Sequence, residues 1–266
     1  MTVSRDPQDQ GAGLPERVRL EVHDILDSTN SLARVRAEAG AADWTVIQAL
    51  EQSAGRGRRS HDWRSPPGNL YTSTLLYPRP PMARWPHLSF VAALAVAEMT
   101  HAMAPDLTVT VKWPNDVLAN GRKISGILLE TVPANRTSAE KSGAVIVGVG
   151  INITSHPEQT RYGATSIAAL TGQGTMMDTA RAHYLNALAR WYDIWSTEGF
   201  AAIRDAWTEI AHGLGQEVRI TDDGVPDRAG LYTSIDEEGR LMLQTPGGAI
   251  ERVAAGSLSF VDAGEA

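Results

Sequence analysis

Hydrophobic and polar residues alternate along several short stretches of the chain, which is the pattern of half-buried β-strands. The first stretch is Val18 to Val22, and further stretches are rich in β-branched residues. Ser28 or Thr29 can cap the first helix, and Asn120-Gly121 predicts a hairpin turn. The pattern predicts strands at 18–22, 45–50, 69–76, 107–112, 117–119, 123–131 and 144–153, and helices around 32–36, 85–104, 178–195 and 200–211.

The character of the sequence changes after Gly213. Residues 216–260 form short alternating stretches separated by turn sequences such as Asp222-Asp223-Gly224. This pattern predicts a small all-β module, such as a barrel. The sequence therefore predicts an α+β protein with a loose tail at 1–15, a mixed domain at 16–212 and a β domain at 213–266.

Charge and composition restrict the possible functions. The 266 residues include 24 Lys and Arg against 31 Asp and Glu, and the net charge of −7 disfavours general binding to nucleic acid. The absence of cysteine excludes disulfides, thiolate metal ligands and thiol nucleophiles on this chain. The longest apolar run, 90–97, is far shorter than the roughly 20 residues of a membrane helix, and the N-terminal residues lack the apolar core of a secretory signal. We therefore expect a cytoplasmic protein without a membrane partner.

The segment 52–63 is rich in glycine and arginine. No acid precedes residue 61 within it, and three of its arginines lie within four positions, namely Arg56, Arg58 and Arg59. Glycines at 55 and 57 free the backbone to wrap closely around a ligand. Guanidinium groups bind phosphate or carboxylate through paired hydrogen bonds. The segment predicts an anion-binding loop, and a solvated basic loop explains it equally well.

A second group of candidates follows in the central part of the chain. A proline ends the strand of Lys112, so Asn115 and Asp116 present an amide and a carboxylate at a strand end. An Asp is a suitable ligand for Mg²⁺, although an Asx turn explains the pair as well. Lys123 lies on a strand that leads into Gly126, where backbone can touch a ligand, or it is simply a lysine at a hairpin edge.

The glycines of 148–152 resemble the start of a dinucleotide-binding fingerprint, but Ile153 stands where the third glycine belongs and no predicted helix follows. We infer instead that these small residues make room for a neighbour or a ligand. The sequence shows no zinc-binding histidine pair and no nucleophile–base pair. Such a site would act by positioning and charge neutralisation, which suffices for attack on the α-phosphate of a nucleotide.

Taken in order, these segments resemble the motifs of biotin protein ligases. The resemblance extends from about Asp27 to Ser259, and its specificity lies in five modest motifs that occur in the right order and spacing. They are Asp27-Ser-Thr-Asn30, Gln52-x-x-Gly-Arg-Gly-Arg58 with Trp63, Lys112-Trp-Pro-Asn-Asp116, Lys123-x-x-Gly-Ile-Leu-x-Glu130 and Gly148-x-Gly-Ile-Asn152.

The resemblance implies a fold, a reaction and partners. The expected fold is a mixed β-sheet flanked by helices, like that of class II aminoacyl-tRNA synthetases, with a small C-terminal SH3-like β-barrel. The expected reaction uses ATP, biotin and Mg²⁺ to form biotinyl-5′-AMP and pyrophosphate. Biotin then passes to one lysine of a biotin carboxyl carrier protein domain. A monomer or a weak homodimer is expected.

The resemblance also implies roles for individual residues. Contacts with biotin are implied for Ser28, Thr29, Asn30, Gln52, Gly55, Arg56, Gly57, Trp63, Lys123, Gly126 and Ile127. Contacts with ATP or the adenylate are implied for Arg58, Arg59, Trp63, Lys112, Asn115, Asp116 and Asn152, with Asp116 as the candidate Mg²⁺ ligand. The catalytic set is Lys123, Arg56 and Arg58, and residues 54–65 and 154–174 correspond to mobile loops that cover the ligands.

Several alternatives and departures remain. Lipoate protein ligases share the fold and the chemistry, but the arginine loop and the segment 112–116 favour biotin.

Some family members repress transcription through an N-terminal helix-turn-helix domain, and only 26 residues precede Asp27, so we expect a ligase without repressor activity. Where the family often continues its loop with Arg or Lys, this chain has His61, whose charge depends on pH. Binding of RNA or DNA by the arginines is disfavoured by the net charge and by the lack of aromatic residues between them.

Overall fold

The computed structural model describes residues 13–79, 81–133, 143–158, 163–174 and 177–260. Most of the predicted tail at 1–15 lies outside these residues. The strands of the first sheet are β1 (Arg19–Leu26), β2 (Thr45–Gln52), β3 (Leu70–Leu76), β4 (Val109–Lys112), β5 (Asp116–Ala119), β6 (Arg122–Val132) and β7 (Ala144–Ile151). The helices are α1 (Thr29–Glu38), α2 (Leu88–Met103), α3 (Ile167–Thr171), α4 (Met177–Glu198) and α5 (Phe200–Glu209), and single 3₁₀ turns form at Arg58–Ser60 and Met82–His87.

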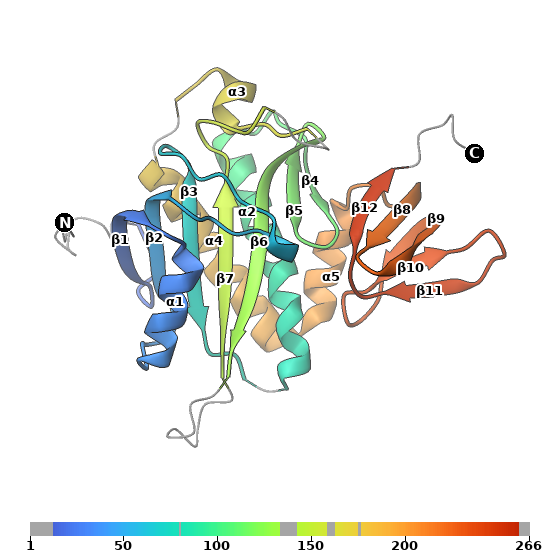
Figure 1. Ribbon diagram of the computed structural model, residues 1–266, viewed down its shortest axis with the longest axis horizontal. Coiled ribbons are helices and arrows are strands. Elements are labelled where there is room, and N and C mark those ends of the chain that lie inside the picture. The colour runs from blue at the N-terminus through green and yellow to red at the C-terminus, as the bar shows by residue number, and fades with distance from the viewer. Residues whose placement is uncertain (1–12, 80, 134–142, 159–162, 175–176, 261–266) are drawn as a thin grey trace.

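The seven strands form one sheet in the order β1-β2-β3-β7-β6-β5-β4 (Figure 1). Strands β1 and β2 are parallel and the other neighbours are antiparallel, so the sheet is mixed. The β5–β6 hairpin turns at Asn120 and Gly121, whose φ values are 49° and 73°. Positive φ at both positions is the requirement of a type I′ two-residue turn, which confirms the hairpin that the sequence predicts.

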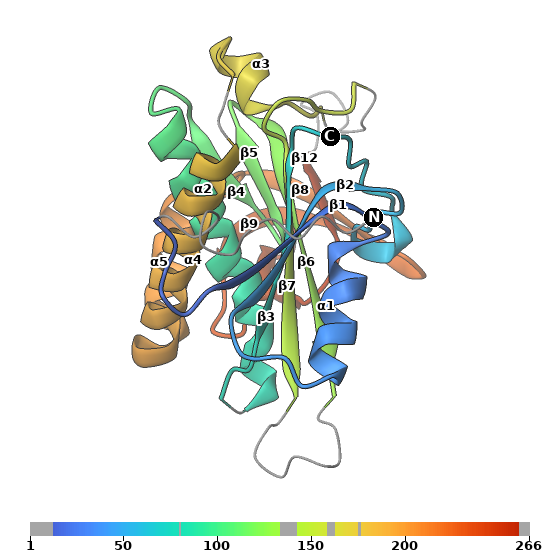
Figure 2. The same ribbon diagram turned by 90° about the vertical axis from the view of Figure 1, so that its left-hand side faces the viewer.

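Helices cover both faces of the sheet (Figure 2). Helices α2, α4 and α5 lie on one face, and α2 is apolar nearly all round because it is buried between the sheet and α4. Helix α1 lies on the opposite face over a smaller apolar cluster that includes Ala33, Ile47 and Ile146. The predicted mixed sheet with flanking helices is confirmed.

Two details of the chain differ from the sequence pattern. Ser28 occupies the N-cap position of α1, but its side chain makes no capping bond. The backbone N–H of Thr29 instead donates to Oε1 of Gln52 at 2.8 Å. The polar stretch after β7 contains the short helix α3, which we did not predict. Its N-cap Ser166 accepts a hydrogen bond from the backbone N–H of Ala169.

The C-terminal residues form a second, antiparallel sheet. Its strands are β8 (Glu217–Asp222), β9 (Val225–Ile235), β10 (Leu241–Gln244), β11 (Ile250–Val253) and β12 (Ser257–Phe260), in the order β11-β10-β9-β8-β12. The separate small β domain is confirmed, but the described strands do not close into the expected barrel. Strand β12 pairs with β8 and strand β11 with β10, and no pairing joins β11 to β12 among the described residues. These two strands are therefore the open edges of the sheet.

The second sheet packs firmly against the first domain. The indole N–H of Trp113, at the end of β4, donates to the backbone oxygen of Gly239 in the β9–β10 turn at 3.0 Å. Apolar side chains of β8 to β12 belong to the same continuous core as α2 and α4. In the described part of the chain, no helix is long and apolar enough to cross a membrane.

Candidate active site

A single large cavity of about 570 Å³ brings the predicted site residues together. Its lining includes residues of α1, of the segment 54–65 and of the second sheet. The predicted residues that line it are Ser28, Thr29, Asn30, Gln52, Arg56, Gly57, Arg58, Arg59, Trp63, Lys112, Asn115, Asp116, Lys123, Gly126, Ile127 and Asn152. Gly55 is outside this lining, and it packs against Ser65.

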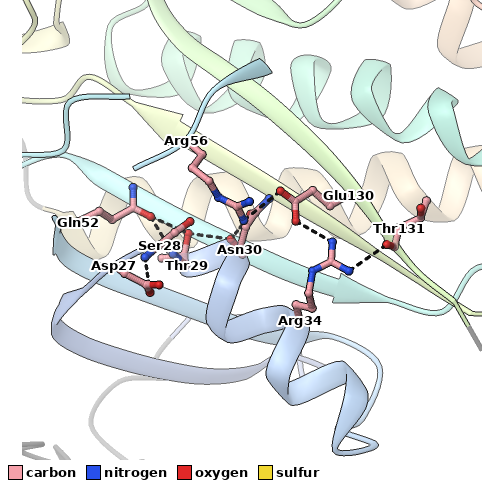
Figure 3. A network of polar contacts seen from close by, with 10 residues as sticks. Asp27, Ser28, Thr29, Asn30, Arg34, Gln52, Arg56, Glu130 and Thr131 are labelled. Atoms are coloured by element: carbon pink, nitrogen blue, oxygen red, sulfur yellow. Dashed lines mark hydrogen bonds and ion pairs between the residues drawn. The ribbon is translucent and has the colours of Figure 1, made fainter. Parts of the chain in front are cut away.

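One end of the cavity is a buried network of neutral polar groups (Figure 3). Gln52 Oε1 accepts from both the backbone N–H and the hydroxyl of Thr29, at 2.8 and 3.1 Å. The hydroxyl of Ser73, on β3, donates to Asn30 Oδ1 at 2.6 Å and lies 2.7 Å from Thr29 Oγ1. The side-chain N–H₂ group of Asn30 is buried without a protein partner. This end therefore offers fixed donors and acceptors to a neutral polar ring.

Gln52 also connects this network to the arginine loop, which we define as residues 54–65. Its Nε2 donates to Ser65 Oγ at 2.8 Å, and Ser65 Oγ donates to the backbone oxygen of Trp63 at 2.9 Å. The backbone N–H of Trp63 donates to the oxygen of Gly55, so the loop folds back on itself. A Cβ at Gly55 would meet Ser65 Oγ at 2.5 Å, which explains the glycine there.

The three arginines of the loop extend to three different parts of the protein. Arg56 pairs with Glu130 on β6 at 3.0 Å, and Arg59, whose φ is 53°, pairs with Asp222 of the second sheet. Arg58 donates to Asn115 Oδ1 at 3.1 Å. Burial lowers the pKa of Arg58, and the positive charge of Arg59 lowers it further. The arginines are therefore anchored to the protein and do not form an open basic patch.

The middle of the cavity carries an ion pair. Lys123 Nζ lies 2.7 Å from Asp116 Oδ1 and 5.4 Å from the centre of the Trp63 ring. Burial lowers the pKa of nearby Lys112, while the charge of Asp116 opposes that shift. Two lysines with one carboxylate between them leave a net positive charge here. This region is suited to an anion.

Glycines on β6 and β7 make room for the side chains around the ion pair. A Cβ at Gly150 would meet Trp63 Cε2 at 2.6 Å, and one at Gly148 would meet Asn30 Cγ at 2.9 Å. Gly126 is the cross-strand partner of Gly150 and lies against the same indole ring. The prediction that the 148–152 glycines make room for neighbours is confirmed, and the neighbours are Asn30 and Trp63.

The segment 154–174 contacts the site through backbone hydrogen bonds. The N–H of Lys123 donates to the oxygen of Gly163, and the N–H of Thr165 donates to the oxygen of Lys123. Asn152 Nδ2 donates to the oxygen of Thr165 at 3.1 Å. Asn69, which the sequence interpretation missed, accepts three backbone N–H groups from 153–155. These bonds hold residues 153–155 against Asn69, next to β3, and residues 163–165 against Lys123 and Asn152.

Comparison with known proteins places the chain in a family. Residues 22–152 match the Biotin/lipoate A/B protein ligase family, and residues 213–261 match the Biotin protein ligase C terminal domain. A biotin–[acetyl-CoA-carboxylase] ligase of Paracoccus denitrificans is 37% identical over 228 residues, which cover 84% of this chain and 92% of that protein. The chain belongs to the biotin protein ligase family.

Solved structures of biotin protein ligases share the fold. The Aquifex aeolicus enzyme in complex with biotin and ATP has a TM-score of 0.77 and 26% identity, covering 91% of this chain and 97% of that one. The Leishmania major enzyme in complex with biotinyl-5-AMP has a TM-score of 0.61 and 25% identity, covering 91% of this chain and all of that one. The resemblance that the motifs indicate is thereby confirmed.

Some residues of this biotin protein ligase site have no counterpart among the predicted ones. Ser73 and Ser65 orient Thr29 and Gln52, and His212 and Phe260 line the cavity where it meets the second sheet. The His212 and Phe260 rings pack at right angles with their centres 5.0 Å apart, and burial lowers the pKa of the histidine. No motif marks these residues, because their position depends on contacts between distant parts of the chain.

Proposed function

We propose that this protein is an ATP-dependent ligase that activates biotin as biotinyl-5′-AMP and transfers it to a lysine of a biotin carboxyl carrier protein domain. The observation that carries the proposal is the cavity itself. It joins a neutral hydrogen-bonding end around Thr29 and Gln52 to a cationic middle around Lys123 and Arg58. A molecule with a polar ring at one end and a carboxylate at the other fits this arrangement, and biotin has that form.

The first step joins biotin to the nucleotide. A carboxylate oxygen of biotin attacks the α-phosphorus of ATP, a P–O bond forms, and pyrophosphate leaves. Negative charge accumulates where the carboxylate and the phosphate meet. Lys123 and Arg58 supply fixed positive charge for that point, which is the principal way in which a site of this kind lowers a barrier. Asp116 keeps the Lys123 side chain in place while no ligand is bound.

The second step releases the nucleotide. The uncharged amine of the carrier lysine attacks the carbonyl carbon of biotinyl-5′-AMP, an amide bond forms, and AMP leaves. The same cations stabilise the departing phosphate. We propose a cytoplasmic location because the reaction consumes ATP. We propose a carrier domain of a carboxylase as the acceptor because the Paracoccus denitrificans relative is a biotin–[acetyl-CoA-carboxylase] ligase.

The residues of the site also fit the expected Mg²⁺. Nucleotide-bound Mg²⁺ takes most of its oxygen ligands from phosphates and water and only one or two from protein carboxylates. Asp116 offers one such oxygen, and no cluster of three or more His, Cys, Asp or Glu residues is present among the described residues. A nucleotide-carried ion therefore fits better than a resident metal. It would neutralise phosphate charge beside Lys123.

The test is incubation of the full chain with ATP, Mg²⁺, biotin and a recombinant carrier domain. We expect the mass of the carrier to rise by one biotin residue, and biotin-dependent exchange between pyrophosphate and ATP without the carrier. Omission of ATP and replacement of the acceptor lysine by Arg are the controls. The absence of both activities, with biotin binding also absent, would contradict the proposal.

Lipoate is the natural competitor in the same assay. The family model for 22–152 includes lipoate ligases, but the match of 213–261 is to the biotin protein ligase domain specifically. The buried donors and acceptors around Asn30 and Gln52 suit a polar ring, and lipoate would leave them unpaired. We expect lipoate to be a much poorer substrate than biotin.

A further inference from the structure

Glu130 is an acidic residue of β6 to which the sequence interpretation gave no role. Its side chain is only 15% exposed. Its two oxygens serve two different partners, because Oε1 lies 3.0 Å from Nη2 of Arg56 and Oε2 lies 3.0 Å from Nη2 of Arg34. Figure 3 shows the carboxylate between the two guanidinium groups. One nearly buried charge therefore joins β6 to the arginine loop and to α1.

The position of Glu130 along β6 places this contact at one end of the cavity. Gly126, Leu128 and Glu130 alternate along the strand and share a face, and the first two line the cavity. Glu130 lies four residues, or roughly 14 Å, beyond Gly126. Arg56 reaches this point from the loop, above Asn30. The contact thus ties the loop down at the end where the neutral polar network lies.

The charge balance makes this contact different from an ordinary surface ion pair. Arg34 and Arg56 are both held close to one carboxylate, so each would face another positive charge if that carboxylate were neutral. Arg56 is 45% exposed and belongs to a loop, whereas Arg34 is part of α1. Loss of the negative charge would therefore displace Arg56 first, because the loop yields more easily than the helix.

We propose that Glu130 is a positioning residue of the ligase, which holds Arg56 and thereby keeps the arginine loop closed over the biotin end of the cavity. The inference rests on the proposed function for the identity of the ligand. The contact of Glu130 with Arg56 is a property of the protein without ligand. In this role Glu130 controls how quickly biotin and the adenylate escape, and it does not touch the reacting atoms.

The experiment compares Glu130→Gln with Arg34→Gln. We measure hydrogen exchange of residues 54–65 in the ligand-free protein and the dissociation rate of biotinyl-5′-AMP. Glu130→Gln should raise both by about 3- to 10-fold, as expected for the loss of a partly buried charged contact. Arg34→Gln should leave both within about twofold of wild type, because Glu130 then serves Arg56 alone. The double variant Glu130→Gln/Arg34→Gln should give exchange and dissociation rates between those of the two single variants, because Arg34 no longer repels Arg56.

A control separates this role from general stabilisation of α1. Arg36, on the same helix, pairs with Glu21 of β1 away from the cavity, so Glu21→Gln removes a similar helix–sheet contact. We expect it to change the melting temperature but neither loop exchange nor adenylate dissociation. If Glu130→Gln does not fold, Arg56→Gln tests the same contact from the loop and should raise exchange equally.

Two results would overturn the inference. Unchanged exchange of residues 54–65 in Glu130→Gln would show that Arg56 does not depend on this carboxylate. Equal effects of Glu130→Gln and Arg34→Gln would show that Glu130 only joins α1 to β6. Failure of the proposed function is distinguishable, because wild-type protein would then form no biotinyl-5′-AMP while the ligand-free exchange measurement would still decide the role of Glu130.

Discussion

Replacement of Gly150 by Ala tests how tightly Trp63 is seated over the sheet. The new methyl group would lie 2.6 Å from Trp63 Cε2, whereas ordinary contacts begin near 3.4 Å. Gly150 does not have a positive φ, so alanine introduces no backbone strain and the effect comes from the side-chain clash alone. Either β7 and the indole ring shift together, or Trp63 leaves its position and the arginine loop opens.

The two responses have different signatures. Overpacking of a filled site costs about 1–3 kcal/mol. If Trp63 stays, that cost appears as lost stability and lowers the melting temperature by roughly 2–12 °C for a protein of this size. If Trp63 moves, the melting temperature changes little, and biotinyl-5′-AMP dissociates faster because the ring no longer covers it. In both cases the affinity for biotin falls.

The assay combines thermal unfolding with adenylate dissociation, and Gly247→Ala is the control. Gly247 lies outside the cavity between β10 and β11, is exposed and has no positive φ, and its would-be Cβ meets only Thr245 Oγ1, at 4.0 Å. It should behave like wild type in both measurements. A Gly150→Ala variant with wild-type melting temperature and wild-type adenylate dissociation would refute the reasoning, because Trp63 would then not pack closely against β7 at this position.

Three further predictions concern charge. Lys123→Ala should slow biotin-dependent pyrophosphate release by about 100- to 1000-fold but weaken biotin binding much less, and an equal loss in both would refute its role. Arg58→Gly should speed adenylate escape by about 10- to 150-fold, so that biotin appears on bystander proteins such as added serum albumin, and no excess label would contradict this. Burial lowers the pKa of His87 to about 4, and the nearby charge of Arg84 lowers it further. The unfolded chain therefore takes up the proton first, near pH 6.5, and about 2 kcal/mol of stability should be lost between pH 8 and pH 5, as urea unfolding of wild type against His87→Gln will measure.

Local pattern was sufficient to predict much of this fold. Alternation and β-branched residues identify each strand of the first sheet, and Asn120-Gly121 identifies one hairpin, because these signals arise within a few neighbouring residues. Element ends were less accurate. The strand at 18–22 continues to Leu26, and α2 begins at Leu88 after a 3₁₀ turn that contains Pro86. Helix α3 was missed because it is only five residues long.

Contacts between residues that are distant in the sequence could not be predicted from the local pattern. Ser73 lies more than forty positions from Thr29 and Asn30, and no motif links them. The position of His212 depends on how the second sheet packs on the first. The open edge between β11 and β12 was also missed, since alternation predicts strands but does not predict which edges pair. The family motifs identified the residues of the cavity because a motif records which residues come together in the folded proteins of a family. It does not give the contacts that bring them together.

The arginine loop shows why residue type alone could not assign roles within the site. Three cations close together suggest an anion-binding patch, but Arg56 is paired with Glu130 and Arg59 with Asp222. Arg58 differs, because its hydrogen-bond partner is the neutral amide of Asn115 and its pKa is lowered by burial and by Arg59. A phosphate that replaced Asn115 would bring a negative charge to the guanidinium group, which would offset both its burial and its repulsion by Arg59. We therefore expect Arg58 to take the phosphate charge, while its two neighbours hold the loop in the position from which Arg58 can do so.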